Sequence, residues 1–597
     1  MNQNYTEVRN AQIVLYLLKA RGIRKVVASP GTQNMAIVVS MQHDPYFEMY
    51  SAVDERSAAY IACGLAAESG EPVVLSCTGA TASRNYLSGL TEAYYRHLPV
   101  VAITSSAPLA MIGHNIAQTI DRSQIQKDVA KISVVARTVR TPQDEWDCTV
   151  QVNKALLELY HHGIGPVHIN IEKIDGDFHV EELPKARVID RICNGDTFPT
   201  LPNGKISIFV GAHPVWSDAL TKAVDTFCRK FNAAVFCDQT SNYHGEFAIR
   251  GSIIASQDWY LSPIFATSLL IHIGDVSGDY YLTGKVGKAK EVWRVCEDGE
   301  IKDTFKKLTN VFEMSELSFF EHYNSLTEEK NTDFTGTYLQ ECKDELSKIK
   351  NKIPELPFSN IWIVGELSCH LPQNSILHFG ILNSLRAWNF AEIDASISTF
   401  CNVGGFGIDG GMSALVGSSL AHPDKLHFGF FGDLAFFYDM NVLGNRHVGK
   451  NLRILMVNNA KGTEFRLYSH PASLLGEDAD EYISAARHFG NKSPHLVRHY
   501  AEDLGFEYLT ASNKEEFTAA MSVFVDPMIK EKPILFEIFT DSVDENNALS
   551  LLNNIEKSKE NQRKDKIKKL IGEENAHAIQ RLINKLKSLV STKNGRV

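Results

Sequence analysis

Short apolar runs alternate with helical patterns along most of the chain, and this alternation is the strongest constraint on its fold. In the first 180 residues the runs are KVVAS, EPVVLSCTGAT, LPVVAITSS and GPVHINI, and helical segments such as ERSAAYIACGLAAESG lie between them. Because the runs are apolar on both faces, they predict parallel strands in a sheet that helices cover on both sides.

The same alternation restarts twice, which predicts three domains. A proline-bearing stretch at 194–205, NGDTFPTLPNGK, indicates a linker. The second set of runs is ISIFVGAHP, AAVFCDQTSNY, LLIHIGDV and EVWRVCEDG, and the third is SILHFG, LHFGFFGD, RILMVNN and PILFEIFTD. We therefore predict an α/β protein with three consecutive open parallel-sheet domains over 1–190, 200–345 and 355–550.

The last segment, 555–597, differs from the rest in charge. It holds twelve Lys and Arg residues against five Asp and Glu residues, and its apolar residues recur every three to four positions. This pattern predicts a basic amphipathic helical tail. The tail could pack on its own chain or on a neighbouring subunit, or it could bind a membrane surface or an acidic partner.

Composition excludes several classes of protein. The net charge of −11 argues against a general nucleic-acid binder. No run of 18 apolar residues appears, so we expect no membrane span, and the N-terminus MNQNYTEVRN lacks the features of a leader peptide. Ten cysteines without a CxxC pair fit buried thiols in a reducing cytoplasm. We therefore expect a cytoplasmic globular protein.

Polar residues follow two neighbouring strands of the third domain. In FGDLAFFYDMNVLGNRHVGKNLRILMVNN, Gly432 and Asp433 end one apolar run, and Asn458 and Asn459 end the next. Ligands bind at the carboxyl ends of parallel strands, and carboxylate and amide oxygens suit Mg²⁺ together with phosphate. Gly432 would allow the backbone to approach a phosphate closely. Taken alone, the same residues also fit two ordinary structural turns.

The order of further motifs carries a resemblance to a known family. Along the chain follow SPGTQ, VDERSAAY, SCTGAT, AQTID, GIDGG, GDL and NN. This succession resembles the thiamin-diphosphate (ThDP) enzymes, in particular the menaquinone-pathway synthases that make 2-succinyl-5-enolpyruvyl-6-hydroxy-3-cyclohexene-1-carboxylate. The resemblance covers about residues 5–550. It implies that the three domains are a pyrimidine-binding, a central and a diphosphate-binding domain.

The resemblance implies which residues hold the cofactor and the metal. Glu55 matches the glutamate that hydrogen-bonds the aminopyrimidine ring of ThDP. Its alternative role is that of an acid stabilised at a helix N-terminus. Asp433, Asn459 and the backbone carbonyl of Lys461 match the Mg²⁺ ligands. Because the glutamate and the metal site belong to different domains, the resemblance implies a site between two subunits, in a homodimer or a dimer of dimers.

Further positions follow from the same resemblance. Gln118, in AQTID, matches a polar active-site residue, and Ile408 matches the aliphatic residue that holds the cofactor in a bent form. The other cofactor contacts that the motifs imply are Thr78, Asn383, Ser384, Gly432 and Leu434.

The chain departs from the family where the synthases bind anionic substrates, 2-oxoglutarate and isochorismate, through arginines. Gln33, Ala107 and Val403 stand at three of these positions, and no basic pair is evident in GDVSGDYYLTGK. Because a charge-assisted hydrogen bond contributes roughly 1.5–3 kcal/mol, their loss implies a different substrate. Possible substitute cations are Arg122, Arg386, Lys461 and Arg466.

Two residues are candidates for chemistry specific to this chain. Glu464 lies five residues after Asn459 and could transfer a proton to or from the substrate, or it could be a solvated acid at a helix start. His114, in GHNIAQTID, could orient a substrate carboxylate or hydroxyl, or it could be an ordinary loop histidine.

Three functions fit these observations. The first is ThDP- and Mg²⁺-dependent decarboxylation of a 2-oxo acid donor, with carboligation to a second, unknown acceptor. The second is the menaquinone-pathway synthase reaction itself. The third is a scaffold or regulatory protein that keeps the fold without turnover.

Overall fold

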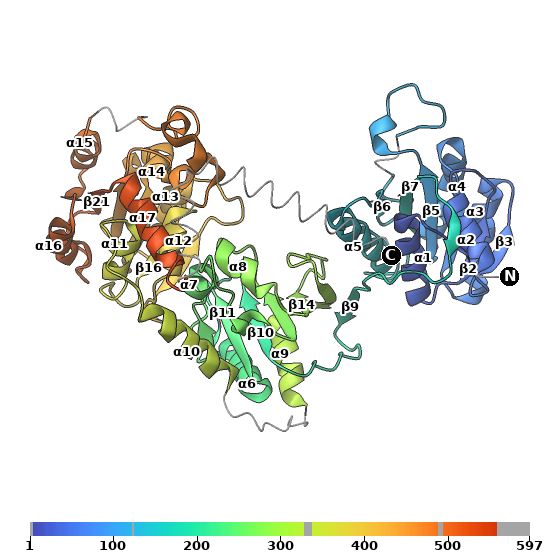
Figure 1. The fold of residues 1–597 in the computed structure, drawn as a ribbon, viewed down its shortest axis with the longest axis horizontal. Helices are drawn as coiled ribbons and strands as arrows, with labels where there is room; N and C mark the ends of the chain where they lie inside the picture. The colour runs from blue at the N-terminus through green and yellow to red at the C-terminus, as the bar shows by residue number, and fades with distance from the viewer. Residues whose placement is uncertain (1–3, 122–124, 327–336, 488–492, 558–597) are drawn as a thin grey trace. The chain divides into compact units, whose positions relative to one another are not determined.

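The computed structural model describes residues 4–121, 125–326, 337–487 and 493–557 (Figure 1). The chain divides into two compact units. Unit 1 comprises Met1–Pro199 with Glu291–Met314, and unit 2 comprises Thr200–Lys290 with Ser315–Val597.

Unit 1 contains a six-stranded parallel sheet in the order β3-β2-β4-β5-β7-β6. The four apolar runs at the start of the chain form its inner strands, as predicted. The two short edge strands β3 and β6 were not predicted. Strand β3 lacks a continuous apolar run, whereas β6 has a short apolar run at 134–136. The strands are β2 (Lys25–Ala28), β3 (Glu48–Ser51), β4 (Val73–Cys77), β5 (Val100–Ser106), β6 (Ser133–Ala136) and β7 (Val167–Glu172).

Helices cover both faces of this sheet, as the two-sided apolar runs predict. One face packs against α1 (Arg9–Ala20), α2 (Met35–His43) and α5 (Pro142–Glu158). The other face packs against α3 (Glu55–Ser69) and α4 (Ala80–Tyr95).

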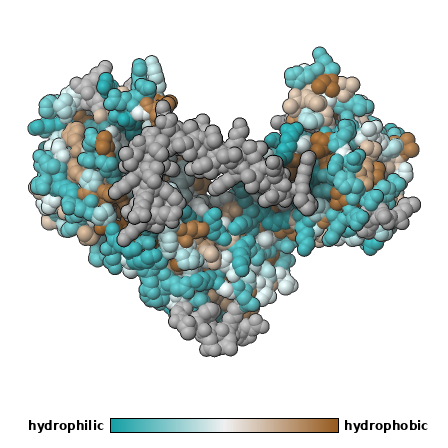
Figure 2. Space-filling view, viewed as in Figure 1, coloured by the Kyte–Doolittle hydropathy of each residue, from teal (hydrophilic) through white to brown (hydrophobic). Residues whose placement is uncertain are grey.

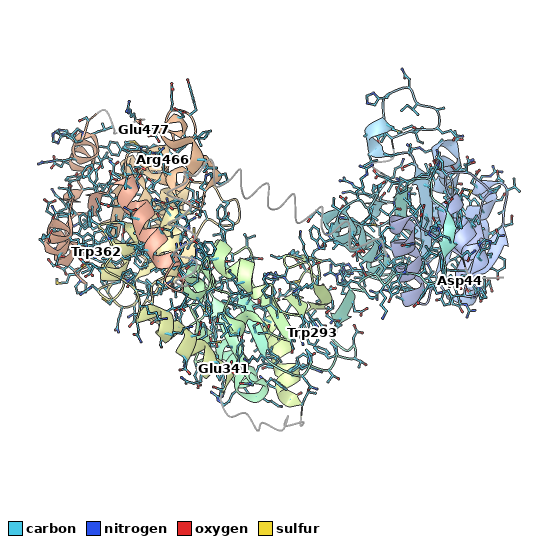
Figure 3. The ribbon with its side chains drawn as sticks, in the orientation of Figure 1. Asp44, Trp293, Glu341, Trp362, Arg466 and Glu477 are labelled. Carbon is cyan, nitrogen blue, oxygen red and sulfur yellow. The ribbon has the colours of Figure 1, made fainter. Side chains whose placement is uncertain are left out.

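A buried polar contact fixes α2 to the start of the chain. Asp44, labelled in Figure 3, accepts hydrogen bonds from Tyr5 Oη at 2.7 Å and from Lys19 Nζ at 2.5 Å. Since a buried carboxylate is costly without partners, this pairing holds the end of α2 in place.

Two further strand groups complete unit 1. Strands β14 (Glu291–Cys296), β15 (Leu308–Glu313) and β9 (Asp190–Cys193) pair in parallel in that order. The short strands β1 (Tyr5–Thr6) and β8 (Phe178–Val180) pair antiparallel.

Unit 2 contains two parallel arrays. The first has the order β12-β11-β10-β13, and helices α6 (Asp218–Phe231) and α9 (Glu316–Ser325) pack on each other beside it. Its strands are β10 (Ile206–Val210), β11 (Ala233–Cys237), β12 (Ala248–Ile249) and β13 (Leu269–Ile273).

The second array of unit 2 is a six-stranded parallel sheet in the order β17-β16-β18-β19-β21-β20. Its strands are β16 (Ile376–Phe379), β17 (Ser398–Cys401), β18 (His427–Gly432), β19 (Leu452–Asn458), β20 (Glu507–Ala511) and β21 (Ile534–Phe539). The third set of apolar runs predicted β16, β18, β19 and β21.

Helices also cover both faces of this second sheet. One face packs against α11 (Asn360–Leu367), α12 (Asn383–Asn389) and α16 (Lys514–Phe524). The other packs against α13 (Gly411–Ala421), α14 (Asp433–Asp439) and α15 (Leu496–Asp503). The α/β class with parallel sheets flanked by helices is therefore confirmed.

Several expectations concern the surface and the tail. All ten cysteines are free thiols, and six of them are buried. Among the described residues, no helix has both the length and the apolarity that a bilayer crossing needs. Figure 2 shows apolar side chains scattered among hydrophilic ones on the visible face. The predicted basic helical tail falls almost wholly in 558–597, outside the described residues.

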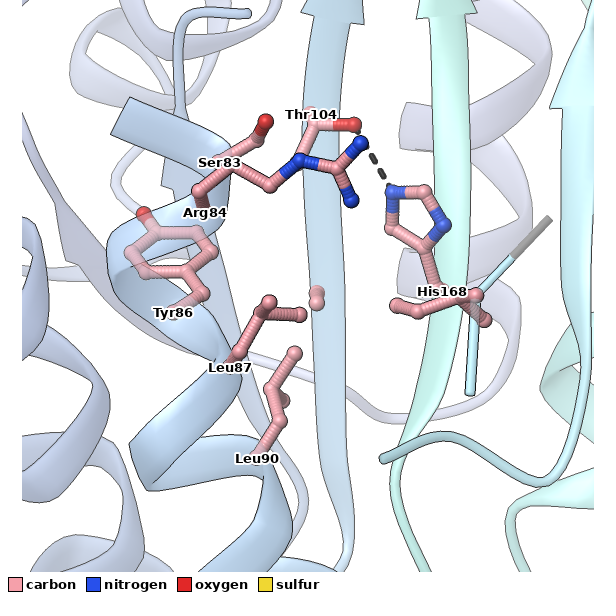
Figure 4. Close-up of a pocket in the computed structure, with 9 residues that line it drawn as sticks. Ser83, Arg84, Tyr86, Leu87, Leu90, Thr104 and His168 are labelled. Carbon is pink, nitrogen blue, oxygen red and sulfur yellow. Dashed lines mark hydrogen bonds between the residues drawn. The ribbon is translucent and has the colours of Figure 1, made fainter. Parts of the chain in front are cut away.

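A small cavity of about 20 Å³ lies between α4 and strands β5 and β7, with His168 at its side (Figure 4). His168 bridges Ser133 Oγ at 2.7 Å and Thr104 Oγ1 at 2.8 Å, and Thr104 donates to Asn170 Oδ1 at 2.9 Å. Since this volume holds about one water molecule, we read the cavity as part of a buried polar network.

Helices α3 and α4 approach each other closely at Gly89. A Cβ atom added at Gly89 would lie 2.4 Å from Ala59 Cβ and 3.0 Å from the Ala59 carbonyl carbon. We predict that Gly89→Ala lowers the free energy of unfolding by about 1–3 kcal/mol, because overpacking outweighs the gain in helix propensity. Denaturant unfolding measures the change. In the control Gly64→Ala, on α3, no atom lies within 4 Å of the added carbon, and equal effects of the two variants would contradict the argument.

Candidate functional site

In unit 1 the site residues that the sequence indicated lie after the carboxyl ends of parallel strands. Glu55 begins α3 after β3, and Thr78 follows β4. Gln118 and His114 lie in the loop between β5 and β6, where both side chains are exposed. Arg84 Nη2, on α4, donates to the Asp121 carbonyl at 2.8 Å and ties the end of this loop to α4. The loop is drawn in light blue at the upper edge of unit 1 in Figure 1.

Glu55 is not the residue that caps its helix. Asp54 is the N-cap of α3 and accepts the Ser57 N–H at 2.7 Å. Glu55 is half-buried, and its Oε2 accepts a hydrogen bond from Asn85 Nδ2 on α4 at 3.2 Å. Because Asp54 already satisfies the helix end, the carboxylate of Glu55 is available for another partner.

Gln33, one of the residues that departs from the family, has a structural role here. Its Oε1 accepts the Gly79 N–H at 3.1 Å, at the N-cap of α4. Thr78 packs beside Gly31, where an added Cβ would lie 2.8 Å from Thr78 Cβ. The segment SPGTQ therefore supports the turn that enters α4.

In unit 2 the site residues come from four neighbouring strands. Asn383 and Ser384 follow β16, and Ile408 follows β17. Asp433 follows β18 and Asn459 follows β19; these two strands pair in parallel with Gly432 opposite Val457. Parallel strands end at the same edge, so the structure brings this set together within unit 2.

Asp433 is a buried carboxyl group without an ion-pair partner among the described residues. Its exposed fraction is 4%, and burial raises its pKa from 3.8 to about 7. Backbone N–H groups of Leu434, Ala460 and Lys461 hydrogen-bond to it, the first at 2.8 Å. No Lys or Arg side chain of the described residues forms an ion pair with it. A divalent cation at this position would offset the cost of burying the charge.

The two asparagines after β19 have different roles. Asn458 Nδ2 donates to Glu537 Oε1 at 2.7 Å, and Glu537, which is 1% exposed, also accepts from Tyr508 Oη at 2.8 Å. The half-buried side chain of Asn459 makes no hydrogen bond within the part of the chain that the structure describes. Asn458 therefore anchors the turn, and Asn459 presents a free amide oxygen.

Three loops at this edge hold non-glycine residues in the left-handed region. Leu382, Phe406 and Ala460 have φ of +61°, +54° and +69° and follow β16, β17 and β19. Each such residue stores backbone strain of about 1–3 kcal/mol, which persists only where the surrounding structure holds it. Strain of this kind gathers at sites that are organised before a ligand binds.

Glu464 is paired rather than solvated. It lies in a short 3₁₀ helix, Thr463–Arg466, and its two carboxylate oxygens accept Arg386 Nη1 and Nη2 at 2.8 and 2.9 Å. Arg386 Nη1 also donates to Asn383 Oδ1 at 2.6 Å. The bidentate pair fixes the position of Glu464 beside the Asn383 loop.

A cavity of about 140 Å³ is lined in part by Arg386. Segment 278–281 lines it from one side, and Leu382, Arg386 and Phe390 line it from α12 and the preceding loop. Burial raises the pKa of Asp279, in this wall, to about 6. Asp279, Tyr280 and Tyr281 therefore line the cavity, in the segment where the family's basic pair is not evident.

The other candidate cations are also paired. Lys461 Nζ contacts Asp480 Oδ2 at 2.7 Å. Arg466, labelled with Glu477 in Figure 3, hydrogen-bonds the Gly476 carbonyl and lies 3.6 Å from Asp480 Oδ1. Arg122 lies outside the described residues.

The residues of unit 2 fit a metal–diphosphate group. Asp433 and Asn459 supply hard oxygen atoms from adjacent strand ends, and an added Cβ at Gly432 would meet no atom within 4 Å. Mg²⁺ prefers such ligands and completes its coordination with water and phosphate oxygens.

Comparison with known proteins shows which class of enzyme the chain belongs to. Residues 8–125 match the family described as "Thiamine pyrophosphate enzyme, N-terminal TPP binding domain". The fold and this match define the class: the protein is a thiamin-diphosphate enzyme.

Similar proteins show which family within this class the chain belongs to. The 2-succinyl-5-enolpyruvyl-6-hydroxy-3-cyclohexene-1-carboxylate synthase of Bacteroides thetaiotaomicron is 32% identical over 90% of this chain and 97% of its own length. The synthases of Phocaeicola vulgatus and Flavobacterium psychrophilum are 31% and 26% identical, over 90% and 92% of this chain and 96% and 98% of their own lengths. The chain belongs to this synthase family.

Sequence reasoning missed some residues that position the site. Glu537 interrupts the apolar run PILFEIFTD, and a glutamate inside a predicted buried strand is a signal that could have marked it. Asn85 carries no comparable signal, because only the packing of α3 on α4 brings it to Glu55.

The pairing of Arg386 with Glu464 predicts a coupled effect on stability. The exposed fractions of the two side chains are 15% and 18%, so removing one partner leaves a charge largely buried. We expect Arg386→Met and Glu464→Met each to lower the free energy of unfolding by about 3 kcal/mol, and the double variant to lower it by less than the sum. Denaturant unfolding of all four proteins gives the coupling energy. Additive effects would show that the two residues do not depend on each other.

Proposed function

We propose that this protein is a ThDP- and Mg²⁺-dependent enzyme that decarboxylates a 2-oxo acid and joins the remaining acyl unit to a second substrate. The buried carboxylate of Asp433, beside the free amide of Asn459 at the carboxyl edge of a parallel sheet, is the observation that carries this proposal. When bound, ThDP supplies a nucleophilic carbon and an electron sink for decarboxylation.

The chain's own residues would hold and orient the reactants. Asp433, Asn459 and the Lys461 carbonyl bind Mg²⁺, and Gly432 leaves room for the diphosphate. Leu434, Ile408, Asn383, Ser384 and Thr78 form the walls of the cofactor site.

Two carboxylates, those of Glu55 and Glu464, carry out the proton transfers. Glu55, oriented by Asn85, holds a proton against the aminopyrimidine ring. Glu464, held in place by Arg386, moves a proton to or from the substrate. Gln118 and His114, in the exposed loop of unit 1, contact the substrate.

A complete site would need two subunits, because Glu55 and the metal ligands belong to the first and third domains. Val53, Tyr60 and Ile61, near Glu55, have exposed fractions of 79%, 48% and 44%. Grouped exposed apolar residues mark interaction surfaces. We therefore propose a homodimer or a dimer of dimers, in the cytoplasm.

The substrate differs from that of the named synthases. Gln33 already accepts a hydrogen bond from the backbone at the start of α4. Val403 is 4% exposed within an apolar cluster. Arg386, Lys461 and Arg466 each pair with a carboxylate of the protein. Where these described positions offer no free cation, a second or third substrate carboxylate would lose roughly 1.5–3 kcal/mol per missing contact. The cavity beside Arg386 suits a neutral, hydroxylated acceptor, which would hydrogen-bond Asp279 and the two tyrosines.

A second candidate is the synthase reaction itself, which the identity of 32% over most of the chain favours. A third is a scaffold without turnover. Glu55, Asp433 and Asn459 together argue against it, because a protein without turnover does not require all three.

Cofactor binding is the first test. ThDP with Mg²⁺ should raise the melting temperature; at about 100 times Kd the stabilisation is about 2.7 kcal/mol. Asp433→Asn should abolish this shift, whereas Asp424→Asn, at an exposed turn, should keep it.

The metal-free Asp433→Asn protein should also melt higher than wild type at pH 8. The raised pKa of Asp433 means that the wild type loses stability as the pH rises through about 7. If Asp433→Asn keeps the melting shift that ThDP and Mg²⁺ induce in the wild type, the metal site is refuted.

Turnover is the second test. Release of CO₂ from a panel of 2-oxo acids, with neutral hydroxylated aldehydes as acceptors, should reveal a donor. Glu55→Gln should lose turnover while keeping the cofactor-induced melting shift, and Glu464→Gln should lower kcat about 10²- to 10⁴-fold. Turnover only with 2-oxoglutarate and isochorismate would establish the synthase reaction instead. Cofactor binding without any CO₂ release would favour the scaffold.

A further inference from the structure

Two histidines and a glutamate meet in unit 1 without sharing any residue with the proposed cofactor site. His161 and His162 lie in the turn after α5, and Glu313 ends β15. One ligand atom from each lies within 4.8 Å of the others. Cys193, at the end of β9, is not one of these three residues, but its thiol donates to Glu313 Oε2, with Sγ 3.8 Å away. The cluster therefore joins three segments that are distant in sequence.

Both imidazoles present Nε2 to the same carboxylate. His161 Nε2 lies 2.9 Å from Glu313 Oε2, and His162 Nε2 lies 2.9 Å from Glu313 Oε1. The two rings meet edge to face, with centroids 3.9 Å apart. His162 Nε2 hydrogen-bonds Glu313 Oε1 and therefore carries its proton in this arrangement. Once that proton moves to Nδ1 of the same ring, the cluster offers two nitrogen ligands and one oxygen ligand to a single ion.

The partner of the other ring nitrogen decides what His161 can do. His161 Nδ1 lies 2.8 Å from Glu158 Oε1, and an ionised carboxylate only accepts, so Nδ1 carries the proton. In the neutral ring Nε2 is then a lone pair that faces the lone pairs of Glu313. Nε2 is buried and makes no hydrogen bond of acceptable geometry. A cation between Nε2 and the carboxylate removes this repulsion.

Glu158 resembles the carboxylates that orient metal-binding histidines from behind. Arg191 Nη2 donates to Glu158 Oε1 at 3.0 Å, and its Nε lies farther from Glu313, at 3.8 Å. Arg191 thus neutralises Glu158. The charge of a divalent ion is then balanced by the Glu313 carboxylate and a Cys193 thiolate.

The turn that carries the histidines is held in a fixed shape. His162 has φ of +50°, in the left-handed region that non-glycine residues seldom adopt. Lys131 Nζ donates to the carbonyls of His161 and Gly163, which fixes the backbone on the other side of the turn. The exposed fraction of the His162 side chain is 68%, so an ion reaches the site from solvent.

We propose that His161, His162, Glu313 and Cys193 bind a structural Zn²⁺ that ties the turn after α5 to β15 and β9. Two nitrogens, one carboxylate oxygen and one sulfur are a ligand set that zinc takes in tetrahedral geometry. On binding, the ion forms a bond to Cys193 Sγ, and the thiol proton passes to solvent.

The test uses the full-length protein stripped with a chelator and held in saturating Mg²⁺, which occupies the hard oxygen site. Co²⁺ is titrated as a spectroscopic probe and then displaced with Zn²⁺. We expect one bound Co²⁺ per chain, with the visible absorption of a tetrahedral site and a sulfur-to-cobalt charge-transfer band. Zn²⁺ should also raise the melting temperature.

The variants separate a metal site from an ion-pair cluster. His162→Ala should abolish the cobalt spectrum and the Zn²⁺-dependent melting shift. Glu158→Gln should weaken binding about 10- to 100-fold. Cys193→Ser should remove the charge-transfer band alone. The control His179→Ala, whose side chain is 64% exposed and lies 3.9 Å from Glu7, should behave as wild type.

Two outcomes would overturn the proposal. One is a cobalt spectrum or a Zn²⁺-dependent shift that His162→Ala retains. The other is a metal-free His162→Ala protein that melts below metal-free wild type while neither protein responds to Zn²⁺. The latter result would assign the cluster to ion pairing. The expected cofactor-induced melting shift depends on Asp433 and not on His162. A negative result for zinc binding therefore leaves the proposed enzyme function testable.

Discussion

A buried carboxylate without a counter-charge is the constraint around which unit 2 is organised. Asp433 accepts backbone N–H groups from its own helix and from the turn after β19, yet burial still disfavours its charged form. The protein keeps this group at a cost in stability. Such a cost is explained when the same position contributes the charge that holds a metal and a phosphate. The strained residues in three adjacent loops add to the same picture of a site prepared before its ligand arrives.

The proposed site combines residues that would hold the cofactor with a substrate pocket that would differ from that of the named synthases. The side chains proposed to hold the diphosphate and the metal lie after neighbouring strand ends of unit 2, as parallel topology requires. The positively charged groups near them are already engaged: Arg386 with Glu464, Lys461 with Asp480, and Arg466 with Gly476 and Asp480. An arginine that pairs with an internal carboxylate orients protein groups instead of binding an anion. Under the proposed function, recognition of the acceptor would then rest on neutral hydrogen bonds.

The histidine cluster shows a similar principle in unit 1. Glu158 orients His161 from behind, much as Asn458 and Glu537 anchor the turn that presents Asn459. In both places a polar group outside the proposed ligand set holds a neighbouring residue in position. Such supporting groups are separated in sequence from the residues they position, so only packing reveals them.

The sequence by itself determined the α/β class and most inner strands, because two-sided apolar runs between helices fit only a covered parallel sheet. It also placed Asp433 and Asn459 at strand ends, since the runs FGFFG and RILMV end there. It could not identify the edge strand β3, whose partly exposed residues lack a continuous apolar pattern. Only the tertiary structure decided that Glu464 is paired, that Gln33 supports α4, and that Glu313 meets His161 and His162. These contacts join residues far apart in the chain, and no local periodicity encodes which distant side chains the packing brings together.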